Sequence, residues 1–99
     1  MQFDGFDWDR GNRSKCQKHG VSIVEIESMF YGAPLVGPDV RHSGKEQRLR
    51  AVGLTAKRRH LFIVFTLRRK DEELLIRPIS ARYMHKKEVE AHEKEISEI

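Results

Sequence analysis

Apolar and polar residues alternate in the second half of this chain, and that alternation limits the possible folds most strongly. Every second position from 61 to 67 is apolar, which is the pattern of a β-strand with one buried face. These residues are Leu61, Ile63, Phe65 and Leu67. Strands are expected over residues 46–55, 59–68 and 74–82, and the short turns between them predict antiparallel neighbours.

The same part of the chain carries the positive charge. Between Arg41 and Lys70 there are ten Lys or Arg residues and one acid, Glu46, so this segment has a charge of +9, while the whole chain has only +4. Because the charges are interleaved with strand residues, they are expected on a folded sheet. A basic sheet favours nucleic acid or another polyanion as its partner. A soluble basic protein without such a partner is the alternative.

A short strand and a helix are expected at the start of the chain. Residues 2–8 alternate aromatic residues and glycine with acids, which indicates a strand. Asp9 offers an oxygen that can cap a helix beginning at Arg10. That helix is expected to run to about His19 and to stop at Gly20, the residue type that most often follows a helix.

The second helix has the clearest local signals. Ser22 and Glu25 have the spacing of a capping box, in which each side chain satisfies a free backbone donor of the other. Gly32 is expected to end the helix, and a short strand at Leu35 and Val36 follows. One stripe of the helix is apolar and is expected to face the core. The stripe consists of Ile23, Ile26, Met29 and Phe30.

The predicted order is β-α-α-β-β-β-β-α within one domain over residues 1–99, with a loop over 38–45 and a tail helix over 85–99. This order indicates an α+β fold, with an antiparallel sheet and the two N-terminal helices on one face. Pro78 lacks a backbone donor, so its strand is expected to be bulged or on an edge there. The tail helix has few apolar residues and is expected either to be mobile or to dock on a partner.

Strand parity sorts the arginines that are expected inside strands. Arg48 and Arg50 share one face, whereas Arg77 and Arg82 are predicted to lie on opposite faces of their strand. An arginine within a strand must reach water, an acid or a ligand, and its planar fork suits a phosphate. Glu46 can pair with Arg48 or with another arginine, so a purely structural ion pair remains an alternative.

Other charged residues are expected at turns and at a helix end. The turn residues either interact with solvent or attract an anionic partner without specificity. Lys18 and His19 are expected at the end of the first helix, where the helix dipole favours a cation. Histidine also exchanges protons near neutral pH, so His19 is either a capping or core residue or a proton-transfer group. The turn residues are Lys57, Arg58, Arg59, Arg68, Arg69 and Lys70.

Several kinds of chemistry are not expected. A single cysteine, Cys16, cannot form an internal disulfide, and a structural role is favoured over a reactive one. The histidines are scattered without the close spacing of zinc ligands, so no metal or other cofactor is expected. No segment has the roughly 20 apolar residues of a membrane span. Acids replace the positive charge of a signal peptide near the N-terminus, so a cytoplasmic location is expected.

Four segments, in order, resemble the BrnT family of bacterial toxins, which are ribonucleases of type II toxin–antitoxin systems with a fold related to RelE. The chain departs from many relatives at Lys15, where they carry Asn, and at His85 and His92, where they carry Arg and Tyr. The matching segments are Phe6-Asp7-Trp8-Asp9, Lys18-His19-Gly20-Val21-Ser22, Glu46-x-Arg48 and Ile79-Ser80-Ala81-Arg82.

The resemblance implies a metal-independent endoribonuclease with a RelE-like fold, in which the RNA 2′-hydroxyl attacks the adjacent phosphate. It also implies a ribbon-helix-helix antitoxin as partner, with operator DNA bound only through that antitoxin. Two alternatives remain open. One is a non-catalytic, degenerate toxin that acts as a co-repressor in an antitoxin–DNA complex, and the other is a plain nucleic-acid-binding domain.

From this chemistry we assign candidate roles. Arg48, Arg77 and Arg82 are expected to stabilise the phosphate, because cleavage develops negative charge there. His19 is the candidate for proton transfer and Lys18 for charge support. The remaining set is expected to bind RNA, with Glu46 orienting an arginine. That set is Arg50, Arg58, Arg59 and Arg68.

Overall fold

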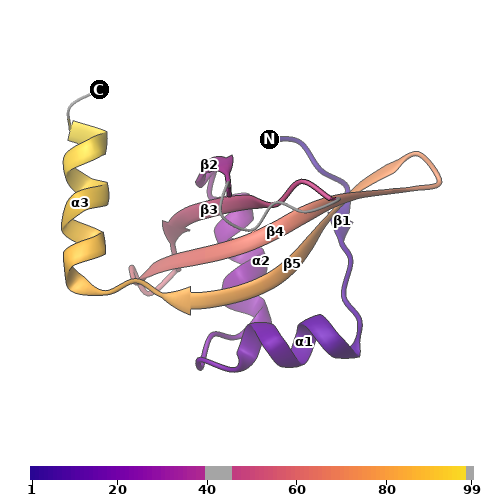
Figure 1. Cartoon of the computed structure of the whole chain (residues 1–99), viewed down its shortest axis with the longest axis horizontal. Coiled ribbons are helices and arrows are strands. Elements are labelled where there is room, and N and C mark those ends of the chain that lie inside the picture. The colour runs from indigo at the N-terminus through magenta and orange to yellow at the C-terminus, as the bar shows by residue number, and fades with distance from the viewer. Residues whose placement is uncertain (40–45, 98–99) are drawn as a thin grey trace.

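The computed structural model of the chain describes residues 1–39 and 46–97, with side chains to residue 94. The loop predicted over 38–45 and the last two residues of the predicted tail helix therefore fall largely outside the described residues. The elements shown in Figure 1 are β1 (Gly5–Phe6), α1 (Arg10–Gln17), α2 (Ile23–Tyr31), β2 (Leu35–Pro38), β3 (Leu49–Leu54), β4 (His60–Lys70), β5 (Glu73–Tyr83) and α3 (Lys86–Ser97).

Five strands form one sheet in the order β1-β5-β4-β3-β2. Neighbours from β2 to β5 are antiparallel, but β1 is parallel to β5, so the prediction of a purely antiparallel sheet is wrong. The cause is a long-range pairing that no local pattern contains. The backbone N–H of Asp4 donates to the carbonyl of Leu74 at 2.8 Å, and the Asp4 carboxylate accepts from the Leu74 N–H at 2.7 Å.

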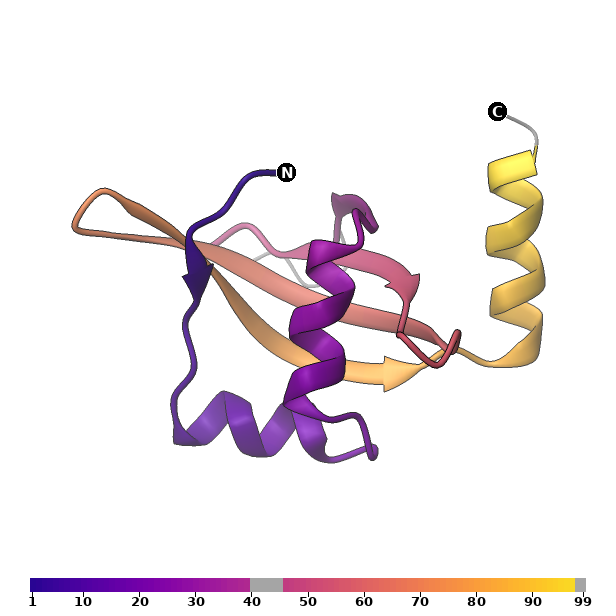
Figure 2. The ribbon, with the colours of Figure 1, turned by 180° about the vertical axis from the view of Figure 1, so that it is seen from behind.

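The core lies between the sheet and α2, which crosses one sheet face as Figure 2 shows. Ile26, Met29 and Phe30 of the predicted apolar stripe are buried there. The sheet contributes its alternate apolar side chains, and Phe30 meets Phe65 edge to face with ring centroids 5.0 Å apart. α1 packs against β5, whereas α3 stands beyond the end of the sheet (Figure 1). The sheet face turned away from α2 carries no helix among the described residues.

Both predicted helix starts are capped. Ser22 accepts from the Glu25 N–H at 3.1 Å and its own N–H donates to the Glu25 carboxylate at 3.0 Å, which confirms the capping box. Asp9 forms the equivalent box with Asn12. α1 ends at Gln17, slightly before the predicted end, and Gly20 follows with φ +87°, a conformation that favours glycine.

A β-bulge in β5 sets the direction of the side chains that follow it. Phe65 of β4 pairs with Pro78 and Val64 pairs with Ser80, so Ile79 is an extra residue in β5. The bulge expected at Pro78 is therefore confirmed. The extra residue reverses the alternation, and Arg82 consequently lies on the same face as Arg77. The prediction that these two arginines face opposite sides is wrong, because strict alternation takes no account of a bulge.

Two strand boundaries also differ from the prediction. β3 begins at Leu49, so Arg48 directly precedes the strand, and its carbonyl accepts from the Asp39 N–H at 2.9 Å. β4 extends to Lys70, and the hairpin turn consists of Asp71 and Glu72, both with positive φ. Two-residue hairpin turns use this backbone geometry because it matches the strand twist. The basic residues from 68 to 70 therefore belong to the strand end and not to the turn.

Gly53 allows α2 to approach the sheet closely. A Cβ at this position would lie 2.8 Å from Cγ of buried Met29 and 3.1 Å from Cβ of Pro34. We expect Gly53→Ala to lower the free energy of unfolding by about 1–3 kcal/mol, because the core would be overpacked. Urea unfolding followed by circular dichroism measures this change.

Gly37→Ala is the matched control for that measurement. Among the described residues, its added Cβ would meet only the Nε of Arg50, at 4.0 Å. We expect a change within about 0.5 kcal/mol at this site. Equal losses in the two variants would contradict the close-packing explanation for Gly53.

Candidate functional site

The sheet face turned away from α2 gathers three arginines from strands that are far apart in sequence. We call it the arginine face. Arg50 of β3 pairs in register with Val64, and on the other side of β4 Arg82 pairs with Phe62. Arg77 lies opposite Thr66 farther along β5. The β-bulge is what brings Arg82 to this face.

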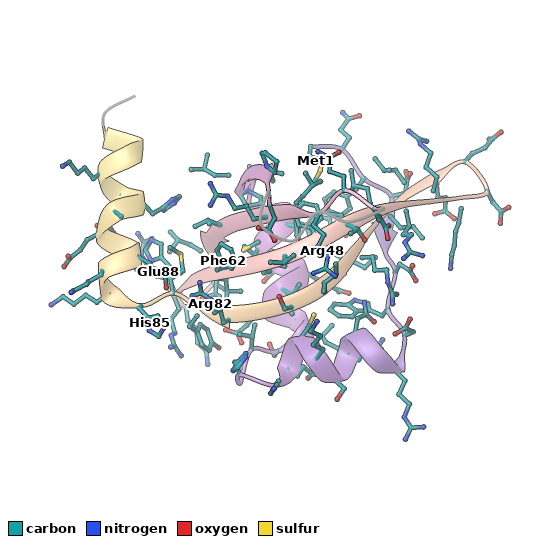
Figure 3. The ribbon with its side chains drawn as sticks, in the orientation of Figure 1. Met1, Arg48, Phe62, Arg82, His85 and Glu88 are labelled. Atoms are coloured by element: carbon teal, nitrogen blue, oxygen red, sulfur yellow. The ribbon has the colours of Figure 1, made fainter. Side chains whose placement is uncertain are left out.

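Three contacts hold the Arg82 side chain near the N-terminal end of α3. Its two terminal nitrogens donate to the two carboxylate oxygens of Glu88 at 2.8 and 2.9 Å, and its guanidinium lies 4.7 Å from the ring centroid of Phe62. The His85 N–H also donates to Glu88, at 3.0 Å. Figure 3 shows these four residues together where β5 passes into α3.

The electrostatics of this cluster follow from the bidentate pair. The hydrogen bonds from Arg82, together with that from the His85 backbone, lower the pKa of Glu88 to about 2. The same carboxylate raises the pKa of Arg82 above its ordinary value. Glu88 is therefore ionised across the neutral range, and Arg82 is pre-oriented but already paired with an acid of its own chain.

Arg77 has a different environment. It donates to Asp9 at 2.8 Å and lies 3.6 Å from Asp7, and its side chain is only 20% exposed. Lys70 also approaches Asp7, at 3.8 Å. The hydrogen bond with Arg77, after that from the Asn12 backbone, lowers the pKa of Asp9. Arg77 thus connects the N-terminal segment to the sheet.

The other arginines divide into paired and unpaired groups. Glu46 binds Arg68 through two hydrogen bonds of 2.9 and 3.2 Å, so it orients an arginine as expected, although the partner is not Arg48. For Arg48 and Arg50, no acidic partner lies within ion-pair distance among residues 1–39 and 46–94. Arg58 is exposed in the turn before β4, with φ +63°.

Lys18 and His19 lie at the end of α1, and both are exposed. In the described residues, no hydrogen bond or ion pair joins them to the arginine face. Figures 1 and 2 agree that α1 runs in the same direction as β5, so the turn after α1 lies toward the α3 end of the sheet. Nearby Cys16 is fully buried, and burial raises the pKa of its thiol to about 11, which supports a structural role.

A second aromatic contact occupies the other face at the same sheet end. The Arg59 guanidinium stacks on the Tyr83 ring, 3.5 Å from its centroid, and the Tyr83 hydroxyl donates to Glu25 at 2.9 Å. Arg59 and Arg82 thus lie on opposite faces. The structure therefore does not gather all the predicted residues into one cluster.

Several residues beside Arg82 have no role in the sequence prediction. A cavity of about 310 Å³ opens between α3 and the sheet, and Arg50, Phe62, Glu88 and His92 line it. The rings of His92 and His60 meet edge to face with centroids 6.0 Å apart. Finding these residues requires the strand register and the position of α3, so no local sequence signal identifies them.

The described part of the chain contains neither a metal-binding cluster nor a membrane-spanning helix. Among the side chains described, those of residues 1–39 and 46–94, no cluster of three or more His, Cys, Asp or Glu is arranged to hold a metal ion. None of the helices described is long and apolar enough to cross a membrane.

Together, the fold and the site define a small basic α+β domain with arginines gathered on one sheet face. Over residues 8–88 the chain matches the family described as the ribonuclease toxin BrnT of type II toxin–antitoxin systems. Because the match covers most of the chain, the protein belongs to the BrnT family. Membership implies an antitoxin partner and supports a ribonuclease role. No curated protein matches the chain.

The Arg82–Glu88 pair has a testable pH dependence. The pKa of Glu88 is about 2 in the folded protein and 4.5 ordinarily, so its contribution is present above pH 4.5 and is lost as the pH falls through 2. Both side chains are about one-third exposed, so we expect Glu88→Gln to lower the free energy of unfolding by about 1 kcal/mol at pH 7. Urea unfolding between pH 7 and about pH 2 measures the difference.

Glu46→Gln is the control, because it changes the same group at the more exposed Arg68 pair. We expect a smaller loss there, since solvent screens exposed ion pairs. A Glu88→Gln deficit that persists undiminished at the acidic end would contradict the ion-pair explanation.

Proposed function

We propose that this protein is a toxin that cleaves RNA without a metal ion, and that it thereby inhibits translation and growth. In the reaction, the 2′-oxygen attacks the adjacent phosphorus and the bond to the 5′-oxygen breaks. The products are a 2′,3′-cyclic phosphate and a 5′-hydroxyl. One group must take the 2′-hydroxyl proton and another must give a proton to the leaving oxygen.

The single observation that carries this proposal is the pre-oriented Arg82 on a face shared with Arg50. Guanidinium groups that are fixed before the substrate arrives stabilise the charge of a phosphorane without reorganisation. Phe62 and Glu88 hold Arg82 in this way, and a phosphate oxygen would replace the Glu88 carboxylate. Arg48, directly before β3, would add a third cation. These guanidinium groups supply the positive charge that a metal would otherwise provide.

The remaining predicted residues take supporting roles in this proposal. His19 is the candidate for proton transfer and Lys18 adds positive charge, because the turn after α1 lies toward the Arg82 end of the sheet. Arg77 fixes the arginine face through its pairs with Asp7 and Asp9. The other basic residues attract the RNA backbone, an effect that weakens with salt. They are Arg58, Arg59 and Arg68.

The proposed antitoxin is a ribbon-helix-helix protein whose acidic side chains cover the arginine face. Operator DNA would then be bound through the antitoxin alone. The Arg82–Glu88 pair also favours a second candidate function. Because Arg82 is already neutralised, the protein could be a non-catalytic toxin-like module that acts as a co-repressor in the antitoxin–DNA complex.

Cleavage of labelled RNA in EDTA tests the proposal. We expect the wild-type protein to cleave RNA but not the all-deoxy strand, because only RNA carries the 2′-hydroxyl. Arg82→Ala and His19→Ala should each lower kcat by about 100-fold or more. Arg69→Ala, in an exposed part of the β4–β5 hairpin, is the control and should retain near wild-type activity.

The outcomes separate the candidate functions. Cleavage that persists in the Arg82→Ala, His19→Ala double variant would contradict the site assignment. Cleavage that requires a divalent ion would contradict the metal-independent mechanism. If the wild-type protein cleaves no RNA but still binds its antitoxin and strengthens operator binding, the co-repressor function is supported instead.

A further inference from the structure

We propose that the cavity between α3 and the sheet is a nucleobase subsite, which holds one unpaired base of the RNA stacked on Phe62 beside the phosphate at Arg82. This inference rests on the proposed function, because it names the part of the RNA that the site recognises. It assigns a binding role to Phe62 and to the wall formed by α3.

The cavity has the size and lining for one flat ligand. Its volume of about 310 Å³ is at the lower end of the range for ligand pockets. Val52 and Phe62 of the sheet and Met84 and Ala91 at the α3 side contribute apolar surface to the walls. Polar groups lie among these walls, where the edge of a base could meet them. They are Arg50, Glu88 and His92.

The charge pattern selects RNA among possible flat ligands. Arg82 contacts the Phe62 ring, and Arg50 also lines the cavity without an acidic partner among the described residues. A ligand that is both planar and anionic satisfies the aromatic ring and the two guanidinium groups together. Proteins recognise single-stranded RNA by this combination of stacking on an aromatic side chain and cation contacts to the backbone.

The walls of the cavity also favour an unpaired base over a paired one. α3 and β2 both contribute to the walls of the cavity, and Val36 and Gly37 belong to the β2 wall. A base can enter only when it is unstacked and turned out of a helix, because the base edges of a duplex are engaged with one another. The subsite therefore predicts a preference for single-stranded RNA.

Binding measurements on Phe62 variants test this subsite. The probe is a short single-stranded RNA with a 2′-O-methyl backbone, which cannot be cleaved, and its fluorescence anisotropy reports binding. Phe62→Leu keeps an apolar side chain but removes the ring, so we expect about 5- to 100-fold weaker binding. Phe62→Trp should bind at least as tightly as the wild-type protein.

An abasic series identifies the cause of that loss. The same probe is made with one abasic residue at each position in turn. At one position, the missing base should weaken wild-type binding and should also abolish the difference between the wild-type protein and Phe62→Leu. Tyr31→Leu is the matched control, because Tyr31 is an aromatic residue of α2 that is 72% exposed. It should bind every probe as the wild-type protein does.

Two results would overturn the subsite. One is wild-type affinity in Phe62→Leu, and the other is an equal loss on intact and all abasic probes, which would indicate that Phe62 only supports Arg82. These results differ from a failure of the proposed function. If the wild-type protein cleaves RNA and Phe62→Leu binds the probe normally, only the subsite is refuted. If binding follows the expected pattern but no RNA is cleaved, only the catalytic proposal is refuted.

Discussion

The β-bulge in β5 is the constraint on which the arginine face depends. The register of β4 and β5 shifts between Val64 and Phe65, and Ile79 is accommodated as an extra residue. Every side chain of β5 after the bulge changes face as a result. Ala81 enters the core, and Arg82 joins Arg50 and Arg77 on the opposite side. This one backbone irregularity therefore directs Ala81 into the core and Arg82 to the sheet face on which a ligand could bind.

Acidic residues of the chain already occupy much of this basic surface. Glu88 pairs with Arg82, the N-terminal acids pair with Arg77, and Glu46 pairs with Arg68. These pairs reduce the desolvation cost of placing arginines within a sheet, because each guanidinium has a partner. An anionic ligand must therefore displace one of these acidic side chains before it can bind Arg82, Arg77 or Arg68. Arg48 and Arg50, which have no acidic partner among the described residues, are groups that a phosphate could approach without displacing such an acid.

The parts of the fold that depend on local chemistry could be predicted from the sequence. The Ser22–Glu25 cap, the buried face of β4 and the bulge at Pro78 all follow from neighbouring residues. Relations between distant segments could not be predicted. The parallel pairing of β1 with β5 requires Asp4 to meet Leu74, and the contact of Arg82 with Glu88 depends on where α3 stands.

The family match ends at residue 88, within the first turn of α3. Arg82, Phe62 and Glu88 therefore belong to the matched region, whereas Ala91 and His92, which complete the cavity wall, lie beyond it. A phosphate site needs only the matched part, since its chemistry is the same at every nucleotide. A base-binding wall must suit particular bases and can change without disturbing the cations that act on the phosphate. The boundary thus leaves Phe62 and the cations within the matched region and places only the last part of the cavity wall, Ala91 and His92, beyond it.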